Sequence, residues 1–220
     1  MIYQLKLLIK LIPFTYRCKL SVLGMVIVYI LGIVITLVFP GEGLGGLFLM
    51  MGPIWLSQLI ISLTVSDMVQ ASPLKKALHT HLLAAATFIC SVVSYLLVII
   101  LDEICRFIYP AYTDGDCAFQ RLTCCGIVVL FALYVSFCYK YFVLSSIMLF
   151  VGVEAIVMFH SYIAFTPQHM ANLNIPLPLA TLLGFVVIFL GALMQYGITC
   201  LLYKKPLSKR AQYAGLRKQM

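Results

Sequence analysis

The sequence predicts an all-α, polytopic membrane protein with six transmembrane helices, and two observations support that fold class. Of the 220 residues, 63% are hydrophobic and only 10% are charged, whereas a soluble domain of this length carries roughly a quarter of its residues charged. Long apolar runs also recur along the chain, and about 20 apolar residues are what a helix needs to cross the hydrocarbon core. A transmembrane β-barrel would show segments of about 10 residues with strict alternation, a pattern that this sequence lacks.

The apolar runs divide the chain into six expected spans separated by polar or turn-forming segments. Pro40 and Gly41 end the first span, since this pair is a turn signal. The second span includes Pro53, which neighbouring helices can accommodate in a membrane. The longest polar segment, Asp102 to Arg121, is expected to be a loop outside the membrane. The expected spans are Leu20–Phe39, Gly46–Ser66, Thr80–Leu101, Leu122–Cys138, Phe142–His160 and Leu177–Leu202.

The distribution of charge predicts a multi-pass protein of the cell membrane with both termini in the cytoplasm. In that orientation all but Arg106 and Arg121 of the 15 Lys and Arg residues are cytoplasmic, as the positive-inside rule requires. Five of the seven acidic residues fall outside: Glu42, Asp102, Glu103, Asp114 and Asp116. The net charge of +8 does not indicate nucleic-acid binding, because no soluble stretch is long enough to form a basic domain face.

The two ends of the chain form separate regions in this prediction. Residues 1–18 are expected to form an amphipathic helix on the cytoplasmic interface, with Lys6 and Lys10 one turn apart on its polar side. An irregular basic N-terminus is the alternative. Residues 19–203 form the six-helix transmembrane domain, and residues 204–220 form a basic cytoplasmic tail.

No catalytic or metal-binding motif is present in the chain. HExxH, GxSxG, a pair of intramembrane aspartates and a GxxxxGK[ST] loop are all absent. The segment Asp114-Gly115-Asp116 lacks the remaining ligands of a calcium loop, and the cysteines and histidines have no zinc-site spacing. Cys105 and Cys117 share the expected outer loop, where they either pair in a disulfide or stay free. We therefore expect no catalytic residue, metal or cofactor in this chain.

Glu154 is the one ionisable residue expected deep within a span. A carboxyl group inside a membrane is costly and therefore indicates a function by default. Glu154 is expected to contact a cationic substrate, to carry protons or to pair helices. In the last case its hydrogen-bond partner would be Ser57 or Gln58 on the second span, or Gln195 on the sixth.

The order of these elements resembles the transmembrane subunits of ABC-2-type exporters. The stretch Tyr3 to Lys10 is similar to the interfacial elbow helix of that family, and the inner connection at Lys140 is similarly short. The polar segment 161–176 lies where the family often places re-entrant helices. The connection between the second and third spans resembles the coupling helix that docks on the ATPase, although Ala71-Ser72 stands where a Leu often precedes the proline. Its residues are Ser72, Pro73, Leu74, Lys75, Lys76, Ala77 and Leu78.

This resemblance implies a permease subunit that exports a peptide, lipid or other amphiphile. It implies a cytoplasmic ATPase subunit that binds ATP and Mg, and a second transmembrane subunit, identical or homologous, in the lipid bilayer. Three other functions stay open. The chain could be an integral membrane enzyme acting on lipid or peptide, an assembly or immunity protein without a transport role, or the substrate-binding subunit of a vitamin uptake transporter. The last usually has an AxxxA face in its first span, which this chain lacks.

Overall fold

The computed structural model describes residues 13, 18–40, 43–65, 75–138, 140–164 and 175–204. The expected interfacial helix therefore lies outside the described residues except for Pro13 and Cys18, and the basic tail lies outside them except for Lys204. The described helices are α2 (Cys18–Val38), α3 (Leu44–Met50), α4 (Gly52–Val65), α6 (Lys75–His79), α7 (His81–Ile108), α8 (Asp114–Cys138), α9 (Phe142–Ala164) and α11 (Leu177–Tyr203).

Six helical segments are long and apolar enough to cross a membrane. The helices α3 and α4 together form one of them, and α6 and α7 together form another. The described ranges contain no strand. The predictions of an all-α fold and of six segments of spanning length are therefore confirmed for this part of the chain.

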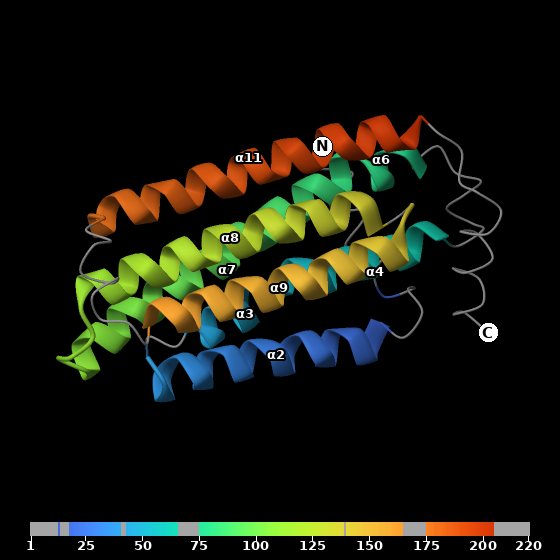
Figure 1. Ribbon diagram of the computed structural model, residues 1–220. Coiled ribbons are helices and arrows are strands. Elements are labelled where there is room, and N and C mark those ends of the chain that lie inside the picture. The colour runs from blue at the N-terminus through green and yellow to red at the C-terminus, as the bar shows by residue number, and fades with distance from the viewer. Residues whose placement is uncertain are drawn as a thin grey trace.

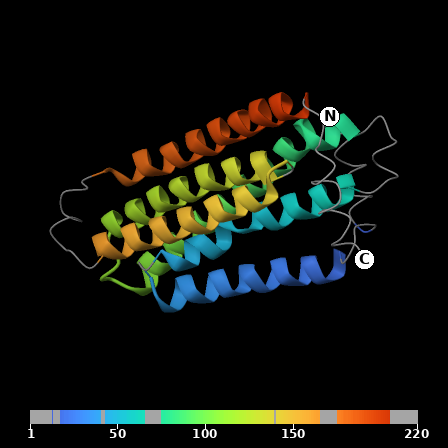
Figure 2. The same ribbon diagram turned by 45° about the vertical axis from the view of Figure 1, so that its right-hand side comes forward.

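The spans run up and down in an elongated bundle with α7 and α8 near its centre (Figures 1 and 2). On one side α2 packs against α3, α4 and α7, and on the other α11 packs against α7 and α8. The helix α9 lies on the outside of α8. The share of residues that are buried in the most apolar stretch of a span differs widely. It is 61% for the span Leu44–Leu63 and only 6% for the span Phe142–Tyr162. The bundle thus has a packed centre and three peripheral helices that expose apolar side chains.

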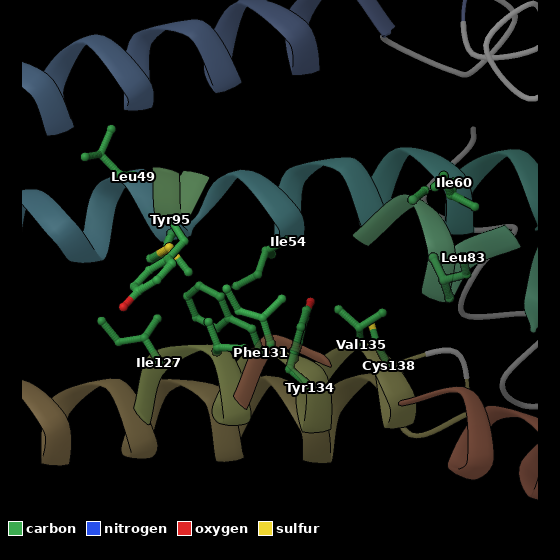
Figure 3. Packing of buried hydrophobic residues seen from close by; sticks show 14 of the residues in the cluster. Leu49, Ile54, Ile60, Leu83, Tyr95, Ile127, Phe131, Tyr134, Val135 and Cys138 are labelled. Carbon is green, nitrogen blue, oxygen red and sulfur yellow. The ribbon is translucent and has the colours of Figure 1, made fainter. Parts of the chain in front are cut away.

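Large apolar side chains fill the contact between the central helices (Figure 3). Leu49, Tyr95, Ile127 and Val135, from α3, α7 and α8, are each 2% exposed or less. Tyr95 also reaches α11, where its ring packs edge-on against Phe185 at 5.2 Å between centroids. Because protein interiors are close-packed, this cluster fixes how the central helices lie against one another.

The second span is interrupted one turn before its middle. The helix α3 ends at Met50 and α4 begins at Gly52, and the amide of Met51 donates to the carbonyl of Phe48 at 3.2 Å in a tightened turn. Proline has no N–H and its ring clashes with the carbonyl four residues earlier, so Pro53 accounts for the break. The predicted span Gly46–Ser66 therefore corresponds to one segment of spanning length, Leu44–Leu63, which consists of two helices.

The predicted outer loop from Asp102 to Arg121 is also wrong. The helix α7 continues to Ile108 and α8 already begins at Asp114, which leaves a short turn between them. At the start of α8 the amide and hydroxyl of Thr113 donate to Asp116 Oδ2, both at 2.8 Å, and the amide of Asp116 donates to Thr113 Oγ1 at 3.3 Å. This reciprocal arrangement is a capping box. It explains why a segment with two aspartates begins a helix.

The third span is likewise preceded by a short helix in a segment expected to be a polar connection. The helix α6 covers Lys75–His79, and α7 starts two residues later at His81. The amide of Ala84 donates to the carbonyl of Thr80 at 3.1 Å, so the two helices are nearly continuous. The helical segment that contains the third span thus begins at Lys75, five residues before the predicted start.

Candidate functional site

Among the described residues, the charged side chains other than Glu154 lie at the two ends of the bundle. Consecutive spans run in opposite directions (Figure 1). One end of the bundle therefore holds the start of α2, the end of α4, the start of α6, the α8–α9 connection and the end of α11. All described lysines lie there, and we call it the lysine end: Lys19, Lys75, Lys76, Lys140 and Lys204. The opposite end, the carboxylate end, carries Asp102, Glu103, Asp114 and Asp116 together with Arg106 and Arg121.

The predicted coupling segment lies at the lysine end and is partly described. Ser72, Pro73 and Leu74 lie outside the described residues, whereas Lys75, Lys76, Ala77 and Leu78 belong to α6. The side chain of Lys76 is exposed. Ala77 and Leu78 are buried in the same apolar cluster as the central helices. The short helix α6 therefore presents a cation outward while its apolar side is fixed within the bundle.

Glu154 does not pair helices within this chain in the way the sequence analysis considered. Its side chain is exposed on α9, and each expected partner bonds elsewhere. Ser57 donates to the carbonyl of Ile54 at 2.7 Å, Gln58 donates to the hydroxyl of Tyr134 at 3.4 Å, and Gln195 accepts from Thr87 at 3.0 Å. Glu154 thus points away from the bundle.

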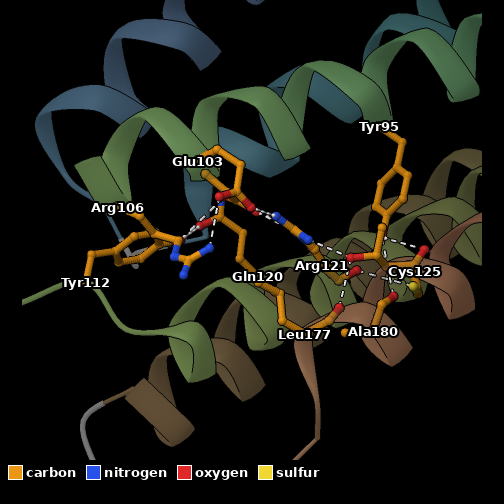
Figure 4. Close-up of polar contacts among 11 residues, drawn as sticks. Tyr95, Glu103, Arg106, Tyr112, Gln120, Arg121, Cys125, Leu177 and Ala180 are labelled. Carbon is orange, nitrogen blue, oxygen red and sulfur yellow. Dashed lines mark hydrogen bonds and ion pairs between the residues drawn. The ribbon is translucent and has the colours of Figure 1, made fainter. Parts of the chain in front are cut away.

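The strongest polar site in the described part of the chain is a buried ion pair at the carboxylate end (Figure 4). Arg121 on α8 donates from Nε to Asp102 Oδ2 on α7 at 3.0 Å, and the two side chains are 3% and 0% exposed. Arg121 also contacts Glu103 Oε1 through Nη2 at 3.1 Å. Its Nη1 donates to the hydroxyl of Thr181 on α11. One guanidinium group therefore links three spans.

Neutral polar groups complete the surroundings of Asp102. Tyr112, in the turn between α7 and α8, donates to Gln120 Oε1 at 2.9 Å and lies 3.5 Å from Asp102 Oδ1. Burial, together with the nearby carboxyl group of Asp102, raises the pKa of Tyr112 well above its usual range, so this hydroxyl remains a donor at neutral pH. The Asp102 carboxyl group is thus bound from two sides.

A second, more exposed layer of ion pairs lies beside the first. Arg106 contacts Glu103 Oε2 at 2.9 Å and Asp114 Oδ1 at 2.5 Å. The side chains of Glu103 and Asp114 are 50% and 66% exposed. Solvent screens such pairs strongly. This layer therefore contributes less to stability than the pair of Arg121 with Asp102.

A small cavity, lined mostly by apolar side chains, lies between α4, α7, α8 and α11. Its volume is about 20 Å³, and Thr87, Ser91 and Gln195 contribute its polar lining. Gln195 Nε2 is buried and makes no hydrogen bond within the described structure. A space of this size holds one water molecule, so it is too small to serve as a passage for an amphiphile.

Comparison with known proteins identifies no relative. The chain matches no protein-family model, no curated protein and no solved structure. Any statement of function therefore rests on the chain's own residues and geometry.

Cys105 and Cys117 belong to one buried cluster and are free thiols, which is one of the two outcomes that the sequence left open. Both are buried and pack beside Tyr112, and the thiol of Cys105 lies 3.4 Å from the carbonyl of Thr36 on α2. Among the described residues no group of three or more His, Cys, Asp or Glu side chains could hold a metal ion. The carboxylate end is thus a site of ion pairing and helix contact.

The pairing of Asp102 with Arg121 does not follow from the predicted layout, because both residues were expected in a loop. A signal was available. Val98, Asp102 and Cys105 follow one another at helical spacing, and all three are buried. A charged residue that continues the buried face of a helix indicates a buried ion pair, whereas the identity of its partner depends on tertiary structure.

Proposed function

We propose that this chain is the membrane-spanning subunit of an ATP-driven exporter. It moves a peptide, lipid or other amphiphile, and a separate cytoplasmic ATPase subunit binds ATP and Mg. The observation that carries the proposal is the position of α6, a short helix at the lysine end that joins an exposed lysine to the packed centre of the bundle.

The helix α6 is placed to pass a movement on to several spans. It contacts α4, α7 and α11, and Leu78 is 1% exposed. The buried ring of His79 lies 6.0 Å from the ring of Tyr203 at the end of α11. Packed interfaces respond to a displacement as rigid bodies rather than by gradual deformation. A protein that pushes on Lys75 and Lys76 therefore moves three spans together.

The charge separation supports an orientation in which that contact is cytoplasmic. Lysines gather at one end of the bundle and carboxylates at the other, and cytoplasmic connections carry the excess of Lys and Arg. The lysine end then faces the cytoplasm in a cell membrane, with both termini on that side. An ATPase that binds cytoplasmic ATP can reach α6 only in this orientation.

The path of the cargo lies between two transmembrane subunits in this proposal. The cavity between α4, α7, α8 and α11 has room for about one water molecule, so it offers no route for an amphiphile. The peripheral helices α2, α9 and α11 instead expose apolar faces. A second subunit, identical or homologous, would form the path together with one of these faces.

The test is co-purification of the tagged chain from its native cells in mild detergent, followed by an assay of ATP hydrolysis. Two variants sharpen it, because Lys76 and Lys204 are both exposed at the lysine end and only Lys76 lies on α6. We expect an ATPase to co-purify, to be lost with Lys76→Glu and to be retained with Lys204→Glu. A chain that purifies alone without ATP hydrolysis, or an equal loss with both variants, would contradict the proposal.

A further inference from the structure

The helix α9 has one side packed on the bundle and one side that is exposed in the described structure. Its inner side buries Ser145 and His160, which are 1% and 3% exposed, and the ring of His160 stacks on Phe119 of α8 at 4.6 Å between centroids. Its outer side exposes large apolar residues, together with Glu154. The inner contact fixes the rotation of α9, so the outer face is defined as well.

Five outer residues follow one another at steps of three and four along α9. Such steps keep side chains on one face of a helix, and their alternation is the heptad spacing of helices that pack in pairs. We call this set the Glu154 stripe: Leu144, Ile147, Val151, Glu154 and Met158.

All four apolar members of the stripe are more than half exposed. The exposed fractions are 57% for Leu144, 56% for Ile147, 60% for Val151 and 70% for Met158. The Glu154 stripe is therefore a continuous outer face of α9 with one polar residue in it.

The depth of Glu154 makes its exposure costly. It lies 12 residues after Phe142 and 8 before Tyr162, the ends of the apolar span, or about 18 and 12 Å at 1.5 Å per residue. It has no hydrogen bond or ion pair with any described residue. Ionisable residues at this depth almost always face protein or water, because an unpaired carboxyl group in lipid is strongly unfavourable. Another protein surface must therefore cover the stripe.

We propose that the Glu154 stripe binds the same stripe of a second copy of this chain. Two copies with the same orientation in one membrane are related by an axis along the membrane normal, so their α9 helices are parallel and equal residues meet. Each Glu154 side chain then has the other as a polar partner across the contact instead of lipid. A single polar residue in an apolar helix contact also sets its register.

This inference deepens the proposed function, which requires a second transmembrane subunit, by naming that subunit and its contact. Its test needs no ATPase, so the two proposals can fail separately. Energy transfer between donor-labelled and acceptor-labelled copies in lipid vesicles measures association. We expect Glu154→Gln, which keeps the hydrogen bonds, to associate as the parent chain does, and Glu154→Leu to associate roughly tenfold more weakly. The control Phe159→Leu, an exposed residue of α9 outside the stripe, is expected to have no effect.

Disulfide cross-linking tests the geometry independently of any change at Glu154. Val151→Cys is expected to cross-link between two copies in native membranes, and Phe159→Cys is not, with the parent chain giving the background from its own cysteines. A monomeric parent chain, unchanged association of Glu154→Leu, or equal cross-linking at both positions would overturn the proposal.

Discussion

Arg121 has a buried carboxylate, Asp102, as its main counter-ion, and the two side chains are 3% and 0% exposed. Removing one member of a buried ion pair leaves the other charge without compensation and costs about 3–5 kcal/mol. We therefore expect Arg121→Met to lower the free energy of unfolding by about that amount. Thermal unfolding of the purified protein in detergent measures the loss.

Arg106 provides the matched control for this prediction, because it pairs with more exposed carboxylates. Exposed ion pairs contribute about 0–1 kcal/mol, so Arg106→Met should change the unfolding temperature little. The double variant Asp102→Leu with Arg121→Met should regain much of the loss, since no buried charge then remains unpaired. Equal effects of Arg106→Met and Arg121→Met would contradict the assignment.

Two features of single residues could not be predicted from the sequence. The exposure of Glu154 could not be predicted, because α9 is apolar on all sides and no polar face distinguishes its inner surface. The pairing of Arg121 with Thr181 could not be predicted either, since the two residues are 60 positions apart. Both results depend on which helices pack together.

At the scale of elements, Gly184 allows α11 to approach α7 closely. A Cβ atom at Gly184 would overlap the hydroxyl and ring of Tyr95, which is fully buried. Overpacking of this kind costs about 1–3 kcal/mol, so we expect Gly184→Ala to destabilise the protein by that amount. Gly197→Ala on the same helix is the control, because nothing lies within 4 Å of its position. A similar loss in thermal unfolding for both variants would refute this role of Gly184.

The sequence predicted the existence of the elements better than their ends. Apolar length located six spans because every span must cover the hydrocarbon core. Their ends were misplaced where polar residues continue a helix, as in α7 beyond Leu101 and α8 before Leu122. Charged side chains suggested a loop there, but the capping box of Thr113 and Asp116 shows that this segment is a helix start.

At the scale of the whole molecule, hydropathy alone could not predict which helices form the centre. In water a helix reveals its inner face by its apolar stripe, but in lipid both faces are apolar. The buried span from Leu44 to Leu63 has a mean hydropathy of 1.7, whereas the exposed spans reach 2.3 to 2.7. The central span Lys75–Ile108, however, reaches 2.5, so hydropathy does not separate the central helices from the peripheral ones.

The separation of lysines from carboxylates predicts how the whole bundle sits in the membrane. Ala111 is exposed in the turn at the carboxylate end, and Lys204 is exposed at the lysine end, so a cysteine at either position disturbs little packing. With a membrane-impermeant maleimide on intact cells, we expect Ala111→Cys to react and Lys204→Cys to react only after permeabilisation. The parent chain gives the background, and the positive-inside rule gives the expected direction. The opposite labelling pattern would place α6 outside the cell, beyond the reach of any cytoplasmic ATPase, and would exclude the proposed coupling contact along with the orientation.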